Sequence, residues 1–153
     1  MIRAVALDID GVLTDGSFWW DASGAELKRF CFRDIMGIAR ASREGIVFAL
    51  ISGERNGIVD RLAAKMNITN IWQACTRKDG ALREFAEKSG LPLEEIAFMG
   101  DDVNDLAALG IAGFSAAPAD AHQSVRSVVK LVTRQPGGNG AVREMLDFLN
   151  LGK

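Results

Sequence analysis

Short apolar runs alternate along the chain with segments of helical periodicity. The apolar runs have the length expected of buried strands, and the longer segments repeat apolar residues every three to four positions. The predicted strands are Ala4–Leu7, Ile46–Ile51, Ile96–Met99 and Val128–Val132, and the clearest predicted helices are Ile58–Met66, Gly80–Lys88 and Ala141–Leu149. This alternation predicts an α/β fold built on a parallel sheet.

A different pattern occupies residues 16 to 32. The apolar segment Phe18-Trp19-Trp20 is followed by a turn-forming stretch at Asp21–Gly24 and by partial alternation from Glu26 to Phe32. Two short alternating runs around a turn predict a β-hairpin. We expect a small flap at about 16–32 rather than a separate cap domain.

Length and charge limit the function classes. The 153 residues fit one domain spanning 1–153. A net charge of −2 gives no broad basic field for nucleic acid or for an anionic membrane. The run Ile46–Ile51 is too short to cross a bilayer, and the N-terminus lacks the layout of a signal peptide. We therefore expect a cytoplasmic protein without nucleic-acid or membrane partners.

The few thiol and imidazole groups do not form a metal-binding pattern. Cys31 and Cys75 are far apart, and His122 is the single histidine. Zinc sites need several such ligands at short spacing. We expect both thiols to be reduced and structural.

Polar residues follow three of the predicted strands. These ends carry Asp8-Ile9-Asp10, Ser52-Gly53 and Gly100-Asp101-Asp102. The carboxyl ends of parallel strands meet at one edge of the sheet, where ligands bind. The sequence therefore predicts one shared site there.

The Asp8 and Asp10 pair suits phosphoryl transfer to an enzyme carboxylate. One carboxylate attacks phosphorus, and the other protonates the leaving oxygen and then deprotonates the water that clears the intermediate. Gly11 lets the chain turn so that both side chains reach the same site. We assign Asp8 to nucleophilic attack and Asp10 to acid–base catalysis.

Carboxylates facing a phosphate require positive charge nearby. Mg²⁺ prefers oxygen ligands, and Asp101 is the expected ligand together with Asp8. Asp105 is expected to support the ligands rather than bind the metal, and the role of Asp102 stays open. Ser52, the Gly53 amide and Lys78 supply phosphate donors.

Each of these pieces alone has an ordinary structural explanation. An Asp-x-Asp-Gly stretch is often a turn, Ser-Gly after a strand is often a loop, and a lone lysine is usually solvated. Their order along an α/β pattern makes a shared active site the better interpretation.

These residues resemble the four motifs of the haloacid dehalogenase superfamily, which map onto Asp8/Asp10, Ser52, Lys78 and Asp101/Asp105. More narrowly, the chain resembles the capless 3-deoxy-D-manno-octulosonate 8-phosphate phosphatases. The segments that carry this resemblance are Asp10–Gly16, Phe32–Asp34, Leu50–Gly53 and Gly137–Glu144. The last of them, Gly-Gly-x-Gly-Ala-Val-Arg-Glu, is the most specific.

The resemblance implies a Rossmann-like core, a hairpin flap and a homotetramer in which a neighbouring subunit closes the site. It also implies a Mg²⁺ site formed by Asp8, the backbone carbonyl of Asp10 and Asp101, supported by Asp102 and Asp105. The substrate contacts that it implies are Thr14, Arg33, Asp34, Glu54 and Lys65. Trp19 and Trp20 fit either a subunit interface or packing on the protein's own core.

Two departures bear on the substrate, a phosphorylated sugar acid. The octulosonate branch carries Arg where this chain has Glu54 and Leu62. A sister branch acting on nine-carbon 9-phosphates resembles this chain in Glu54 and Lys65, although it too has Arg in place of Leu62. Arg55 or Arg61 could replace that guanidinium, and Ile35 could narrow the pocket. We expect the nine-carbon substrate to be preferred.

Two other functions compete with hydrolysis. A similar domain fused to cytidylyltransferases suggests a non-catalytic oligomerisation module, but such a module could lose its motif residues, and all are retained here. A phosphomutase generally needs a cap that excludes water, and the chain has no insertion of that size. Hydrolysis is the expected reaction.

Overall fold

The computed structural model describes residues 1–153 and contains a six-stranded sheet in the order β5-β4-β1-β6-β7-β8. Every neighbouring pair of these strands is parallel. The strands are β1 (Ala4–Leu7), β4 (Val47–Ile51), β5 (Asn70–Trp72), β6 (Ile96–Met99), β7 (Phe114–Ala117) and β8 (Leu131–Val132). The predicted parallel α/β fold without a large cap is confirmed.

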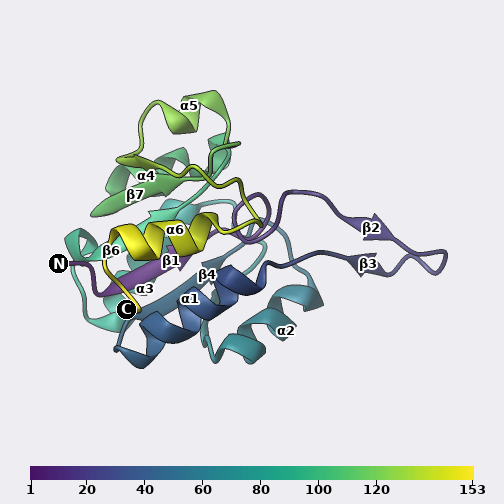
Figure 1. Ribbon diagram of the computed structural model, residues 1–153, viewed down its shortest axis with the longest axis horizontal. Coiled ribbons are helices and arrows are strands. Elements are labelled where there is room, and N and C mark those ends of the chain that lie inside the picture. Colours follow the sequence, from purple (N-terminus) through teal and green to yellow (C-terminus); the bar gives the residue numbers. More distant parts are fainter.

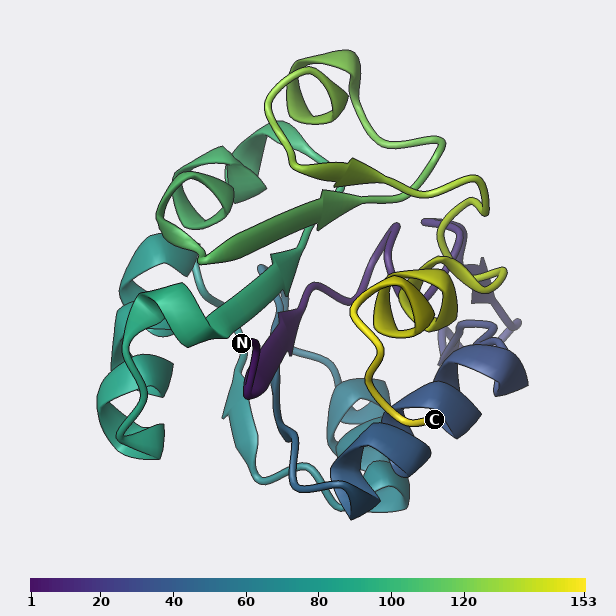
Figure 2. The same ribbon diagram turned by 60° about the vertical axis from the view of Figure 1, so that its left-hand side comes forward.

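Helices cover both faces of the sheet (Figure 2). Val5 and Leu7 pack towards one face, and Ala4 and Ala6 towards the other, as strand alternation requires. The first face is covered by α1 (Phe32–Arg43), α2 (Gly57–Met66) and α6 (Ala141–Phe148), and the second by α3 (Lys78–Ser89), α4 (Leu106–Ile111) and α5 (Gln123–Arg126). None of these helices is long and apolar enough to span a membrane. Burial on both faces explains why the strands are apolar runs.

The structure differs from the predicted elements in a few places. Of the predicted strand Val128–Val132, only Leu131–Val132 pairs in the sheet, and Val128 is exposed. Strands β5 and β7 were not predicted, because Asn70 and Ser115 interrupt their apolar pattern. Two short 3-10 turns, η1 (Leu93–Glu95) and η2 (Val103–Asp105), flank β6.

The hairpin projects from the body of the molecule (Figure 1). It consists of β2 (Trp19–Trp20) paired antiparallel with β3 (Glu26–Leu27), so the predicted flap is confirmed with very short strands. The chain enters α1 at Phe32, where the expected hairpin ended. Trp19 is 52% and Trp20 67% exposed, which excludes packing of this pair on the protein's own core.

The glycine-rich segment before α6 packs against the loop that follows β1. The Gly138 N–H donates to the Val12 carbonyl at 2.9 Å. A side chain at Gly137 would collide with the Gly11 carbonyl, since an added Cβ would lie 1.8 Å from its oxygen. This close approach explains why a distinctive Gly-Gly pair stands here and shows that the motif supports the loop carrying Asp10.

Candidate active site

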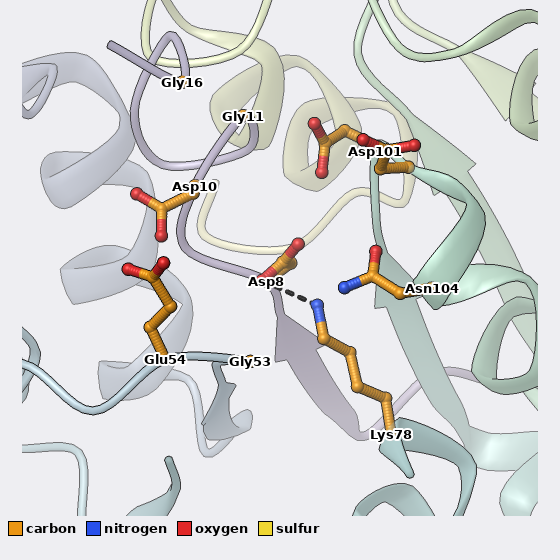
Figure 3. Close-up of a pocket in the computed structure, with 10 residues that line it drawn as sticks. Asp8, Asp10, Gly11, Gly16, Gly53, Glu54, Lys78, Asp101 and Asn104 are labelled. Carbon is orange, nitrogen blue, oxygen red and sulfur yellow. Dashed lines mark ion pairs between the residues drawn. The ribbon is translucent and has the colours of Figure 1, made fainter. Parts of the chain in front are cut away.

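Three strand ends and the first residue of α3 converge on one cavity of about 300 Å³. Asp8 follows β1, Gly53 lies beyond β4, Asp101 lies beyond β6, and Lys78 begins α3. Figure 3 shows the Asp8, Asp101 and Lys78 side chains directed towards a common space, with Gly53 beside it. The cavity is lined only by polar, charged and glycine residues, namely Asp8, Asp10, Gly11, Gly16, Gly53, Glu54, Lys78, Asp101, Asp102 and Asn104.

Lys78 links two carboxylates at the base of the cavity. Its ammonium lies 2.9 Å from Asp8 Oδ1 and 2.7 Å from Asp105 Oδ1. Burial lowers the pKa of Lys78, but the charges and hydrogen bonds of Asp8 and Asp105 outweigh burial and leave that pKa raised. Lys78 therefore stays charged, as a phosphate-binding residue requires.

The carboxylates of Asp8 and Asp101 are crowded. Burial and the charge of Asp105 raise the pKa of Asp8 well above its ordinary value, although Lys78 opposes this. Burial and the same charge raise the pKa of Asp101 to about 7. The carboxylates of Asp8, Asp101 and Asp105 thus carry more negative charge than the Lys78 ammonium offsets.

The donor set suits a hard divalent cation. Carboxylate oxygens of Asp8, Asp101 and Asp105 lie within 4.8 Å of one another. The Asp10 backbone carbonyl accepts no backbone hydrogen bond and so is free to act as a ligand. Mg²⁺ binds such oxygens and would offset the excess charge. The predicted ligand set therefore fits a metal ion.

The two remaining acidic residues differ in what they contact. Asp105 uses both oxygens inside the protein: Oδ1 accepts from Lys78, and Oδ2 accepts from the Asp101 and Asp102 amides at 2.8 and 3.2 Å. Asp102 lines the cavity, but its carboxylate accepts from the Val103 amide at 2.7 Å and caps η2. Asp105 thus orients the loop that carries Asp101. Its carboxylate also lies within 4.8 Å of the Asp8 and Asp101 carboxylates, close enough to share a metal ion with them.

The predicted phosphate-binding residues follow β4. Ser52 is buried, and its hydroxyl accepts a hydrogen bond from the Glu54 amide at 3.2 Å. Gly53 lines the cavity. Asn104 also lines it (Figure 3) and was not predicted, although it lies inside the Gly100–Asp105 motif.

Sequence reasoning also missed Lys28, which follows β3 of the hairpin. Its ammonium lies 2.7 Å from Asp10 Oδ1, and its side chain is 3% exposed. The only local signal was its place at the end of the alternating Glu26-Leu27-Lys28 run. Such alternation predicts that one side of the strand faces the protein, but it does not predict which residues that side contacts.

Thr14 and Asp34, two of the expected substrate contacts, have fully buried side chains whose oxygens accept hydrogen bonds within the protein. The Thr14 hydroxyl accepts from the Gly11 and Gly16 amides at 3.3 and 3.1 Å. The Asp34 carboxylate accepts from the Gly140 and Arg143 amides at 3.2 and 2.9 Å, at the start of α6. Burial raises the pKa of Asp34 despite these bonds. Thr14 therefore holds the loop after β1 in place, and Asp34 holds the start of α6. These contacts are visible only in the folded structure.

Of the three other residues expected to contact substrate, one lines the cavity and two lie outside it. Glu54 lines the cavity, and its carboxylate lies near that of Asp10 (Figure 3). Arg33 lies elsewhere, where it donates to the Asn139 carbonyl at 3.3 Å. Lys65 lines a separate groove with Arg61 and Leu62, so within one subunit it does not reach the Asp8 cavity.

Comparisons with known proteins agree with this geometry. Residues 54–145 match the family model of haloacid dehalogenase-like hydrolases. The chain is 39% identical over 150 residues to the 3-deoxy-D-manno-octulosonate 8-phosphate phosphatase KdsC of Escherichia coli K12, covering 98% of this chain and 80% of that protein.

Solved structures of the same kind superimpose closely. The Moraxella catarrhalis octulosonate 8-phosphate phosphatase, in complex with magnesium, phosphate and KDO, has a TM-score of 0.94 at 36% identity, covering 97% of this chain and 85% of that one. The cobalt-bound Haemophilus influenzae phosphatase has a TM-score of 0.93 at 37% identity, covering 97% and 86%.

Proposed function

The chain belongs to the haloacid dehalogenase-like hydrolases, among the phosphatases of the KdsC kind, and we propose that it hydrolyses a phosphorylated 3-deoxy-2-keto sugar acid with Mg²⁺. One observation carries the proposal most strongly. Asp8 directly follows strand β1, is held by Lys78, and shares one polar cavity with Asp10 and Asp101. Residues 1–153 would act as one phosphatase domain.

In the proposed reaction, a carboxylate oxygen of Asp8 attacks phosphorus, and the bond to the sugar oxygen breaks. Asp10 gives its proton to that oxygen, so the sugar leaves as an alcohol. Asp10 then takes a proton from water as the water oxygen attacks the aspartyl-phosphate, and the bond to Asp8 breaks to release phosphate. Lys78, Ser52 and the Gly53 amide hold the phosphate oxygens. Bound Mg²⁺ would neutralise charge on the transferred group.

The nine-carbon 9-phosphate is proposed as the better substrate, with octulosonate 8-phosphate second. Support comes from Glu54, which lines the cavity where an Arg would favour a substrate carboxylate. A carboxylate there accepts hydrogen bonds from hydroxyl or amine groups but repels an acid. Leu62, where both branches carry Arg, is 4% exposed and packs in the core, so its apolar side chain supplies no charge for a substrate carboxylate.

Assembly is part of the proposal. The cavity is partly open to solvent, and Lys65 with Arg61 lies outside it. A homotetramer would allow these cations, and the exposed Trp19 and Trp20, to meet a neighbouring subunit. Lys65 could then bind the acid group of a substrate in the neighbour's site.

A substrate panel tests the proposal. Phosphorylated sugar acids of eight and nine carbons are compared with ordinary sugar phosphates and nucleotides, with Mg²⁺ and with chelator. We expect turnover of the sugar acids to vanish with chelator and to return with Mg²⁺. Chelator-insensitive hydrolysis would remove the metal from the mechanism, and an intact oligomer inactive on every phosphate would favour the assembly module.

Substrate choice is tested by Glu54→Arg. We expect the ratio of kcat/KM values to move towards the eight-carbon substrate by about 1–3 kcal/mol, the range for a buried polar contact that is exchanged. Glu87→Arg, the same charge change at an exposed position of α3 that does not line the cavity, is the charge control. An equal change on both substrates would mean that Glu54 does not contact the sugar.

A further inference from the structure

Lys28 is the one cation of the hairpin whose side chain is buried against the catalytic loop. Its ammonium lies 2.7 Å from Asp10 Oδ1 and 3.5 Å from Glu26 Oε1, and its side chain is 3% exposed. The Asp10 side chain is 36% exposed, so its other oxygen remains open to the cavity. The contact therefore occupies one oxygen of Asp10 and leaves the second available.

Glu26, which also lies beside Lys28, joins the hairpin to the segment that follows β4. Glu26 Oε1 accepts from Asn56 Nδ2 at 2.8 Å, and Asn56 caps the start of α2. Glu26 Oε2 accepts from the Trp20 indole at 3.1 Å. A chain of polar contacts thus runs from the exposed flap, through Glu26 and Lys28, to Asp10.

Lys28 is surrounded by negative charge. Burial lowers its pKa, but the hydrogen bond to Asp10 and the charges of Asp10, Glu26 and Glu54 outweigh burial and raise that pKa. Without this ammonium, the Asp10 and Glu54 carboxylates, which lie near each other in Figure 3, would repel one another. Asp10 would then be free to turn away from the cavity.

We propose that Lys28 is a positioning residue, which fixes the Asp10 carboxyl so that its free oxygen faces the leaving group and later the attacking water. The proposal rests on the proposed function, because it assumes that Asp10 transfers these protons. It adds that the hairpin supplies part of the proton-transfer machinery within its own subunit. Proton transfer depends steeply on such placement.

Substrates with different leaving groups can distinguish a role of Lys28 in positioning Asp10 from a role in folding alone. An alcohol leaving group needs a proton from Asp10, whereas nitrophenolate leaves without one. In a reaction through an aspartyl-phosphate, kcat/KM reports the steps through departure of the leaving group. A misplaced Asp10 therefore lowers kcat/KM for a primary sugar phosphate much more than for 4-nitrophenyl phosphate.

The test uses Lys28→Met, Lys28→Arg and the exposed-site control Lys88→Met, with saturating Mg²⁺. For Lys28→Met we expect kcat/KM to fall roughly tenfold or more on octulosonate 8-phosphate, part of the usual contribution of a general acid, and less than about threefold on 4-nitrophenyl phosphate. The kcat for both should fall, because water attack needs Asp10 in each case. Lys28→Arg should restore much of the activity, and Lys88→Met should match wild type.

Equal losses of kcat/KM on the two substrates would overturn the proposal, and so would wild-type values on both. If Lys28→Met does not fold, Lys28→Gln replaces it and is judged by the same ratio. Asp10→Asn separates the two levels of the argument. Full activity of Asp10→Asn on the sugar phosphate contradicts the proposed function itself, whereas an inactive Asp10→Asn beside an unselective Lys28→Met contradicts only the role of Lys28.

Discussion

The pocket at the strand ends and the hairpin are built in opposite ways. In the pocket, Asp8 and Lys78 are almost completely buried and are held by the central strands of the sheet. In the hairpin, β2 and β3 contain two residues each, and Trp20 is largely exposed. Polar contacts of Glu26 and of Lys28, which follows β3, tie the hairpin to the loops after β4 and β1.

This difference separates two kinds of function. The pocket concentrates charge in a rigid place, where electrostatic interactions are strong and like charges are costly. The hairpin has little packing of its own, and a pair of strands this short is marginal without a partner. The pocket, together with Lys28 at the base of the hairpin, can therefore carry out chemistry that needs fixed distances. The exposed Trp19 and Trp20 farther along the hairpin leave a surface that is available for contact with a covering subunit.

The largest effect is expected for Asp8→Asn, which removes the nucleophile from the pocket. Turnover should fall by on the order of 10⁴-fold or more, as for other lost nucleophiles. The thermal unfolding midpoint should not fall, because Lys78 keeps Asp105 as partner and one crowded carboxylate is removed. Activity assays and thermal unfolding check both parts. Normal turnover by the folded variant would remove Asp8 from the mechanism.

Gly11→Ala is expected to have the next largest effect. Gly11 has φ +84°, and an added Cβ would lie 1.9 Å from Asp101 Oδ2. Either Asp101 or the loop carrying Asp10 must move, and displacement of a catalytic group by about 1 Å can cost on the order of 100-fold in rate. We expect a loss of roughly that size in kcat.

The hairpin provides a matched control for Gly11. Gly24 has the same φ of +84°, but an added Cβ there meets no atom within 4 Å. Gly24→Ala should therefore cost about 1 kcal/mol of stability from backbone strain and leave kcat unchanged. Equal kinetic losses in the two variants would show that backbone strain, rather than the collision with Asp101, is responsible.

The smallest effect on folding is expected for Trp20→Ala at the flap. Because Trp20 is 67% exposed, its loss should change the free energy of unfolding by less than about 1 kcal/mol under conditions where the chain is monomeric. Phe98→Ala, at a fully buried position in β6, should cost about 3–5 kcal/mol. Denaturant unfolding compares the two. A large loss for Trp20→Ala would mean that the hairpin is part of the folding core.

The sequence alone determined the fold class and the identity of the central chemical groups. Alternating strand and helix patterns placed Asp8, Ser52 and Asp101 after strands, and parallel pairing then required their convergence. The hairpin was also predicted, from the apolar pair Trp19–Trp20, the turn residues Asp21–Gly24 and the alternation that follows them. These signals are local, because periodicity and turn residues act within a few positions of the chain.

Tertiary structure decided which partners those groups meet. Lys78 pairs with Asp105 across 27 positions, Lys28 pairs with Asp10 across 18, and Asp34 bonds to the Gly140 amide across 106. Nothing in the neighbouring residues distinguishes a buried lysine paired with a carboxylate from a solvated one. The contact of Lys28 with Asp10 and the bonds of Asp34 to the start of α6 were therefore not predicted. Such contacts depend on how separate elements pack together, since burial and charge pairing act between residues that only the folded chain brings within a few ångströms.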